Sequence, residues 1–428
     1  MSILFGLKKC ADLKRNGFYI KGHKMRENMS LIKKRIIFID DSQNILDGLK
    51  RSLRKMRDDW EIHFFSFALD ALLFIEENDV VVSDMKMPQM NGAEFLEKVS
   101  EKYPHIVRVI LSGQADEEDI CRSIFHSHQY LSKPCDHEKL TSIVKKAFVL
   151  SNSFEEHYLK VILGINKFPS QPAVYFDLLE AVNKDKFSLN EIVNITQRDM
   201  ALSVQILKLV NSSYFGFSKS ISQIPAAIAY LGLDIIKSLV LETDMFEPVK
   251  NENLKAFELI WAKSKKKAEL AKKIAICAEL ENDLIEECYT AGLIHVCGEI
   301  IVSINFSGKY EEDMQKRNSQ NQQMEKLPEQ RWNTSQEKVG ASLLSIWGLP
   351  ESTVDAIGFY KDPKNHCHKV FSALSVLHIA DAIEENDDGK GTINESKINF
   401  EYLQQAQVPH GIEKLLSLIT NELNKGGC

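Results

Sequence analysis

The chain has 428 residues, more than one ordinary hydrophobic core organises, so two or three domains are expected. Apolar residues make up 44% and charged residues 26% of the sequence, a balance typical of globular proteins that excludes a disordered or collagen-like chain. The net charge of −7 argues against nucleic acid as a partner. We expect no membrane span. Eight cysteines without a Cys-x-x-Cys pair favour reduced thiols in the cytoplasm.

Residues 1–33 are basic and show no clean periodicity. Met25 and Met29 lie just before the first apolar run of the chain. We therefore expect a flexible basic leader, or a natural start further along the chain. Mass spectrometry of the natural N-terminus would distinguish the two.

Between residues 34 and 150, four apolar runs of strand length each end in polar side chains. The runs cover residues 36–41, 80–84, 109–113 and 130–134. Runs of this kind without alternation predict strands that are buried on both faces, as in a parallel sheet. In an open parallel sheet, ligands bind at the carboxyl ends of the strands. We therefore expect one site that gathers carboxylates, a hydroxyl and an ammonium group.

Helical patterns alternate with these runs. Residues 44–56 place Ile45, Leu49 and Leu53 on one face. Further helices are expected over residues 68–77, 92–102, 117–125 and 138–150. Alternating strands and helices predict an α/β fold over residues 34–150, with a doubly wound parallel sheet of about five strands.

After about residue 155 the strand signal disappears. Helices are expected over residues 172–183, 188–196, 199–211, 222–229, 232–247, 252–281, 283–305 and 335–347. Two or three more are expected over residues 366–425, around an acidic stretch at 384–391. We therefore predict an all-α second half, with a helical domain over residues 151–362 and a helical extension over 363–428.

The polar residues at the strand ends have the composition that phosphoryl transfer needs. Asp40, Asp41 and Asp84 offer the oxygen ligands that Mg²⁺ prefers, and such a cation would offset the repulsion among them. A carboxylate can attack a phosphoryl donor to form an acyl phosphate. Ser112 and Lys133 can then contact the phosphoryl oxygens by a hydrogen bond and an ion pair.

Residues 35–150 resemble the receiver domain of two-component response regulators. The resemblance rests on Asp40-Asp41, residues 84–92, Ser112-Gly113 and residues 130–134. It implies that a histidine kinase or a phosphotransfer protein is the phosphoryl donor. It also implies a switch pair, in which Tyr130 turns inward once Ser112 binds the phosphoryl group.

The receiver resemblance further assigns roles at the metal site. The resemblance implies that Asp84 is the phosphoacceptor and that Lys133 is a catalytic residue beside it. Asp41 is implied to bind Mg²⁺ directly, and Asp40 through water. The backbone carbonyl of Lys86 is implied to supply a further ligand.

Residues 158–362 resemble HDOD domains, which are helical relatives of the HD metal-dependent phosphohydrolases. The resemblance rests on residues 168–172, 199–203, 210–216, 221–232 and 291–299. An active HD site gathers several His and Asp side chains around one or two metal ions. Here the corresponding, degenerate site consists of Lys263, His295, Val296, Gln336 and Asp381. Only His295 and Asp381 retain ligating side chains, so we expect no phosphohydrolase activity.

Several other features have simple structural interpretations. The lysine-rich run at residues 263–267 is interpreted as a solvated helix face, and residues 211–216 as a turn that ends a helix. Trp261, Trp347 and His295 are expected in the core. Residues 366–368, His-Cys-His, offer soft ligands, but adjacent ligands on a short loop are not interpreted as a metal site.

These patterns favour a phosphorylation-dependent regulator, in which the receiver controls a non-catalytic HDOD module that binds an unidentified protein or nucleotide. The alternative is a receiver-controlled, metal-dependent phosphodiesterase acting on a cyclic dinucleotide. Metal bound at His295 together with phosphodiester turnover would support that alternative. A DNA-binding regulator is disfavoured by the acidic charge and by the lack of a clear recognition helix. We expect no membrane partner, and a homodimer is compatible with the pattern.

Overall fold

The computed structural model describes residues 34–57, 60–76, 79–113, 126–134, 137–154, 156–184, 188–217, 219–241, 254–304, 334–366, 370–385 and 391–425. The chain divides into two compact units. The first comprises residues 1–166, 212–217 and 346–348, and the second residues 167–211, 218–345 and 349–428. The predicted leader over 1–33 and the predicted helix over 117–125 lie outside the described residues.

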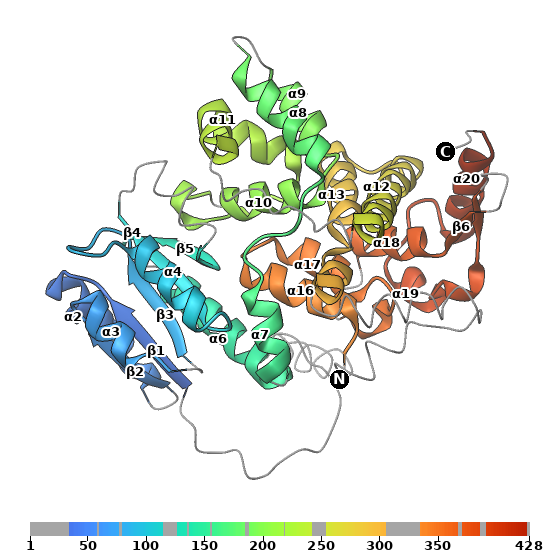
Figure 1. Ribbon diagram of the computed structural model, residues 1–428. Coiled ribbons are helices and arrows are strands. Elements are labelled where there is room, and N and C mark those ends of the chain that lie inside the picture. The colour runs from blue at the N-terminus through green and yellow to red at the C-terminus, as the bar shows by residue number, and fades with distance from the viewer. Residues whose placement is uncertain are drawn as a thin grey trace, which may run out of the picture. The chain divides into compact units, whose positions relative to one another are not determined.

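A five-stranded parallel sheet organises the first unit (Figure 1). Its strands are β1 (Lys34–Ile39), β2 (Trp60–Phe65), β3 (Asp79–Asp84), β4 (Val107–Ser112) and β5 (Gln129–Ser132). They are arranged in the order β2-β1-β3-β4-β5, and all neighbouring pairs are parallel. Ile37, Val81 and Ile110 on the central strands are fully buried, as the unalternating runs predicted. The predicted doubly wound fold is confirmed.

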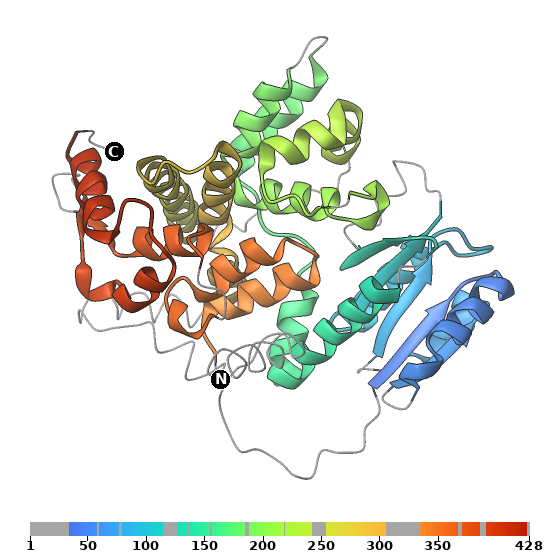
Figure 2. The same ribbon diagram turned by 180° about the vertical axis from the view of Figure 1, so that it is seen from behind.

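Helices flank this sheet (Figures 1 and 2). They are α2 (Gln43–Ser52), the short 3-10 helix η1 (Arg54–Met56), α3 (Ala68–Phe74), α4 (Gly92–Lys102) and α6 (His137–Ser153). Helix α4 begins after Asn91, whose side chain accepts a hydrogen bond from the backbone N–H of Glu94 at 2.9 Å. Such an N-cap satisfies one of the free N–H groups at a helix start. A further helix, α7 (Glu156–Gly164), follows α6 and was not predicted.

A buried arginine connects the start of β4 to the chain that follows α7. The side chain of Arg108 is fully buried. Its guanidinium donates to the backbone oxygens of Pro104, Ile106 and His126 and to Oδ1 of Asn166, at 2.7–3.0 Å. Burial lowers the pKa of Arg108 to about 9, so the side chain stays charged at neutral pH. The positive charge of Arg108 is stabilised by these oxygen acceptors.

The chain beyond residue 167 is mainly helical. Its helices are α8 (Pro172–Asn183), α9 (Leu189–Thr196), α10 (Met200–Val210), α11 (Ile224–Leu241), α12 (Leu254–Cys277), α13 (Asn282–Ile294), α16 (Gln336–Ile346), α17 (Glu351–Phe359), α18 (Ala373–Asp381), α19 (Phe400–Gln405) and α20 (Ile412–Lys425). Short 3-10 helices are η2 (Ser213–Phe215), η5 (Pro363–Asn365) and η6 (Glu395–Lys397). The predicted apolar stripe on α10 is buried, including Leu202 and Ile206.

One hydrophobic core joins α12 and α13 to the C-terminal helices α18, α19 and α20 (Figure 2). Leu270, Leu377 and Leu415 are among its members. The same region contains a two-stranded antiparallel hairpin, β6 (Ile383–Glu385) and β7 (Gly391–Ile393). The predicted helical second half is confirmed apart from this hairpin, which was missed because strands of three residues are too short to show a two-residue periodicity.

Two helices are long and apolar enough to cross a membrane by length and composition, which corrects the expectation that the sequence contains no such stretch. The segment Asn282–Ile304 has 83% of its apolar window buried inside the protein, so its apolar character is explained by the core. The segment Ile224–Leu241 has 39% of its window buried, and Gly232 at φ 77° and ψ 170° interrupts its helical backbone.

Candidate functional site

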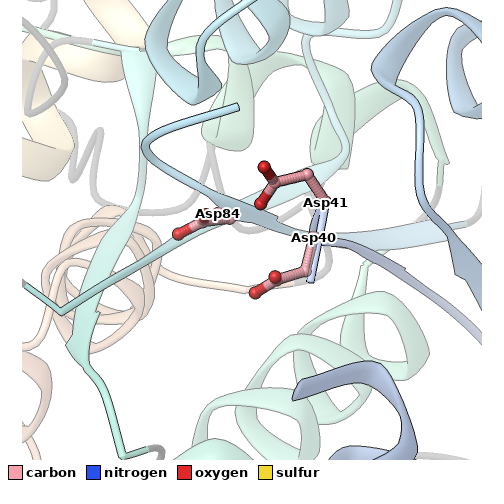
Figure 3. A group of neighbouring side chains, drawn as sticks. All are labelled: Asp40, Asp41 and Asp84. Carbon is pink, nitrogen blue, oxygen red and sulfur yellow. The ribbon is translucent and has the colours of Figure 1, made fainter. Parts of the chain in front are cut away.

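Three carboxylates gather at the carboxyl edge of the parallel sheet. Asp40 follows β1, Asp84 ends β3, and these strands are neighbours in the sheet. Figure 3 shows the side chains of Asp40, Asp41 and Asp84 grouped at this edge. Each offers one oxygen atom within 4.8 Å of the oxygens of the other two. The predicted convergence of strand ends therefore occurs.

The three carboxylates differ in their surroundings. Asp40 is buried and Asp84 is 7% exposed, whereas Asp41 is exposed to solvent. Oδ1 of Asp40 accepts a hydrogen bond from the backbone N–H of Ser42 at 2.9 Å. Burial raises the pKa of Asp84, and the charge of Asp40 adds to this effect, while Lys133 opposes it. A cation placed among these oxygens would favour their ionised forms.

Lys133 already supplies one positive charge to the site. It follows β5, and its Nζ lies 2.6 Å from Oδ2 of Asp40 and 2.6 Å from Oδ1 of Asp84. One ammonium group against three carboxylates leaves two negative charges uncompensated. The donor set is therefore suited to a hard divalent cation.

The loop after β3 is closed tightly around Asp84. The backbone N–H of Met85 donates to the carbonyl of Leu111 at 2.9 Å, and the N–H of Gly92 donates to the carbonyl of Met85 at 2.8 Å. A Cβ atom on Gly92 would lie 2.2 Å from the carbonyl oxygen of Asp84. The start of α4 and the end of β3 can approach this closely only because residue 92 is glycine.

The remaining predicted receiver residues lie at or near the same edge. Ser112 ends β4 and is buried, and Tyr130 on β5 is also buried. Lys86 is exposed and follows Asp84 by two residues. The structure thus brings Ser112 to the end of the strand beside β3. The roles of these residues in phosphorylation, switching and metal binding stay predictions.

The second predicted site, over the helical part of the chain, has a different character. His295 is buried at the end of α13, and its Nδ1 lies 2.6 Å from the carbonyl oxygen of Gly292. Burial, together with nearby lysine charges, holds the pKa of His295 well below its ordinary value. The adjacent Val296 is buried and apolar. His295 is therefore a neutral core histidine.

Lysine–carboxylate ion pairs lie near this histidine. Nζ of Lys263 lies 2.6 Å from Oε2 of Glu299, and Nζ of Lys267 lies 2.6 Å from Oδ1 of Asp381. The interpretation of residues 263–267 as a solvated face is wrong for Lys267, whose side chain is 11% exposed. The pattern of the run could not show that a carboxylate 114 residues further along would pair with it.

Two family models match the chain. The response regulator receiver model matches residues 36–145, and the HDOD domain model matches residues 168–363. The chain therefore contains a receiver domain followed by an HDOD domain. The receiver site and the degenerate centre thus lie in separate domains of known type.

Several curated relatives match parts of this chain. An uncharacterized protein of Treponema pallidum is 24% identical over 263 residues, which is 60% of this chain and 48% of the relative. The hydrogenase transcriptional regulatory protein HoxA of Cupriavidus necator is 33% identical over 116 residues, which is 26% of this chain and 23% of the relative. The chain therefore spans about half or less of the length of these curated relatives.

Among solved structures, a virulence factor of Campylobacter jejuni is similar to this chain. It is 17% identical with a TM-score of 0.51, and the match covers 63% of this chain and 96% of the other. At this identity the likeness supports the fold alone.

The two domains differ in whether they fit a metal ion. Among the residues that the structure describes, the group of three or more close His, Cys, Asp or Glu ligands is that of Asp40, Asp41 and Asp84 in the receiver. Lys267 of the HDOD domain is already paired with Asp381, which lies beyond the HDOD match, and Val296 offers no ligand atom. The receiver residues fit a divalent cation, whereas the described residues of the HDOD domain contain no such group of ligands.

Sequence reasoning missed most of the charged partners in the HDOD domain. Lys361 pairs with Glu337, with Nζ 2.8 Å from Oε1. Gln336, which was predicted to mark a lost ligand position, begins α16, and its backbone packs directly against Gly298. Glu299 follows His295 by four residues, a spacing typical of side chains on one face of a helix. This spacing could have identified Glu299 as a neighbour of His295.

The other interpretations concern turns and core residues. Trp261 and Trp347 are buried, as predicted. Residues 211–216 form the predicted turn, closed by hydrogen bonds between the side chain of Asn211 and the backbone of Ile221. His366 pairs with Asp355 at 2.8 Å, while residues 367 and 368 lie outside the described residues.

Proposed function

We propose that this chain is a phosphorylation-dependent signal transducer whose phosphoacceptor is Asp84. The observation that carries the proposal is the group of three carboxylates within 4.8 Å, with Lys133 bridging Asp40 and Asp84. Its donor would be a histidine kinase or a phosphotransfer protein, and its location the cytoplasm. The receiver would extend over residues 34–150, the HDOD domain over 151–362 and the C-terminal extension over 363–428.

In the proposed reaction, a carboxylate oxygen of Asp84 attacks the phosphorus atom of the donor. A new P–O bond forms as the bond from phosphorus to the donor breaks, and the donor leaves with the electron pair. Asp40, Asp41 and the carbonyl of Lys86 would hold Mg²⁺, which offsets negative charge on the phosphoryl oxygens. Lys133 and Ser112 would bind the remaining phosphoryl oxygens.

Phosphorylation would change the ion pairs of the receiver site. Lys133 now pairs with an oxygen of Asp84 that becomes part of the acyl phosphate, so its Nζ would move to a phosphoryl oxygen. Ser112 and Tyr130 would transmit this rearrangement of contacts along the edge of the sheet. Moving a two-state equilibrium from 1:99 to 99:1 takes about 5.5 kcal/mol of differential interaction, so several such contacts must change together.

The output would be binding by a non-catalytic HDOD module to a protein or nucleotide. The lysine–carboxylate pairs around His295 support this, because they occupy side chains that a phosphodiesterase would need for its metals. The alternative of a cyclic dinucleotide phosphodiesterase has no comparable support in the described residues. Metal-dependent turnover of a cyclic dinucleotide by the purified chain would establish that alternative instead.

The substitution Asp84→Asn tests the assignment directly. With acetyl phosphate and Mg²⁺, the natural chain should gain one acid-stable, alkali-labile phosphoryl group, and the variant should gain none. Asp70→Asn is a matched control, since Asp70 is an exposed carboxylate on α3 and should leave labelling unchanged. Label that persists on Asp84→Asn, with the fold intact by circular dichroism, would show that another residue is the acceptor.

A further inference from the structure

Lys267 of the HDOD domain places a nearly buried ammonium group beside the C-terminal helices. Lys267 projects from α12, and its Nζ lies 2.6 Å from Oδ1 of Asp381 at the end of α18. The same Nζ lies 5.5 Å from the centroid of the Tyr360 ring, a distance at which a cation is attracted to the aromatic face. Lys267 therefore has both a charge partner and an aromatic partner in a nearly buried setting.

His295 contacts the same ring of Tyr360, and it is protonated on Nδ1, as metal-bound histidines often are. The rings of His295 and Tyr360 are edge-to-face, with centroids 5.9 Å apart. Nδ1 faces the carbonyl oxygen of Gly292, which can only accept, so Nδ1 carries the proton. Nε2 therefore presents a lone pair, and it is buried with no hydrogen-bond partner in the described part of the chain. Metal-bound histidines commonly show this arrangement, with one nitrogen donating to a carbonyl and the other facing a cation.

Two further ion pairs flank this group. Lys263 pairs with Glu299 at 2.6 Å, and Lys361 pairs with Glu337 at 2.8 Å. We call the three pairs and His295 the lysine centre. Lys267, Lys263 and Lys361 all lower the pKa of His295 beyond the effect of its burial, so their charges reach the ring. Three ammonium groups and three carboxylates balance, which leaves no net negative charge to attract a metal ion.

We propose that the ammonium of Lys267 takes the place of a metal ion in this HDOD domain and serves as its built-in central cation. The carboxylate of Asp381 holds it, and the ring of Tyr360 lies close both to this ammonium group and to the ring of His295. The module then assembles its centre without metal, and its stability is independent of divalent ions. The inference does not depend on phosphorylation of Asp84, so it and the proposed function can fail separately.

Metal uptake by the full chain tests the inference first. The double variant Asp41→Asn/Asp84→Asn removes the acidic site of the receiver, so that any remaining metal reports on the HDOD domain. After treatment with EDTA and then with Mn²⁺ or Zn²⁺, this variant should retain no stoichiometric metal, and its thermal midpoint should not change. One equivalent of bound metal with a raised midpoint, lost again in a further His295→Ala variant, would overturn the proposal.

Substitution of the ammonium group supplies the second test. Lys267→Ala should lower the thermal midpoint by several degrees, whereas Lys265→Ala, an exposed lysine on the same helix, should not. Adding Asp381→Asn to Lys267→Ala should restore part of the loss, because the carboxylate is then no longer left without its cation. If Lys267→Ala does not fold, Lys267→Gln replaces it in the same comparison. Equal midpoints for the Lys267 and Lys265 variants, or no recovery in the double variant, would contradict a central cation.

Discussion

The substitution Gly92→Ala should disable the receiver site without touching any of its polar groups. An added Cβ would lie 2.2 Å from the carbonyl oxygen of Asp84 and 3.0 Å from Cα of Met85. Ordinary contact begins at 3.4 Å, so the backbone has to open by about 1.2 Å, the difference between 3.4 and 2.2. Both crowded atoms belong to the main chain and cannot rotate away. The opening therefore displaces Asp84 itself.

The magnitude of this effect has two parts. Overpacking of this kind costs about 1–3 kcal/mol of folding free energy. A displacement of about 1 Å at a reacting group can also slow the reaction by about 100-fold, so labelling should fall more than stability alone would explain. Gly48→Ala is the matched control, because Gly48 lies within α2 and an added Cβ would meet nothing within 4 Å. That change should stabilise the chain by about 0.5–1 kcal/mol, since alanine favours a helix over glycine.

Two measurements on the full chain separate these effects. Thermal unfolding should give a lowered midpoint for Gly92→Ala and an unchanged or raised one for Gly48→Ala. The initial rate of labelling by acetyl phosphate, at one Mg²⁺ concentration, should fall only for Gly92→Ala. If Gly92→Ala labels at the natural rate and keeps its midpoint, the loop around Asp84 is not closed in the way that its hydrogen bonds indicate.

Two further predictions concern buried polar groups. Arg108→Leu should cost about 1–3 kcal/mol in denaturant unfolding, because it leaves buried carbonyl oxygens without donors. Arg108→Lys should not restore that loss, while exposed Arg51→Leu should cost nothing measurable; equal stability of all three would refute the reasoning. Burial lowers the pKa of His378, whose Nδ1–H donates to the carbonyl of Tyr360 at 2.7 Å and whose Nε2 accepts from the N–H of Asn399 at 2.8 Å. Below a pH of about 6.5, His378 binds a proton in the unfolded chain but not in the folded chain. The free energy of unfolding should therefore fall, as the pH is lowered, by up to about 1.4 kcal/mol per pH unit. The variant His378→Gln should show a shallower dependence of this free energy on pH than the natural chain.

The receiver fold and the position of its site could be predicted because two general rules act on very local patterns. Strands buried on both faces need unbroken apolar runs, and Ile37 and Val81 lie in such runs. Parallel strands end at one edge, so Asp40 and Asp84 had to meet once the strands were identified. Arg108 could not be interpreted in this way. Its partners come from the segment before β4, from His126 and from Asn166, which only the folded chain brings together.

The helical half was predictable in its elements and much less so in its charges. Apolar periodicity predicted α10 correctly, because the apolar residues of the predicted stripe are buried in that helix. The same reasoning placed Lys267 on a solvated face, since a run of lysines carries no information about distant carboxylates. Its partner Asp381 lies 114 residues further along the chain. Local patterns determine where a helix forms, but tertiary packing determines whether a charge on it is solvated or paired.

Charge balance predicts that the receiver binds a metal ion and that the HDOD domain does not. At the receiver site, Asp40, Asp41 and Asp84 carry three negative charges against the one positive charge of Lys133, so two remain. The three ion pairs of the lysine centre carry three charges of each sign, so we expect them to attract no further cation. A buried ion pair contributes little net stability but costs about 3–5 kcal/mol when one partner is removed. Divalent ions should therefore bind in the receiver alone, where phosphorylation would need them, and the HDOD domain should keep its fold whether or not the receiver is loaded.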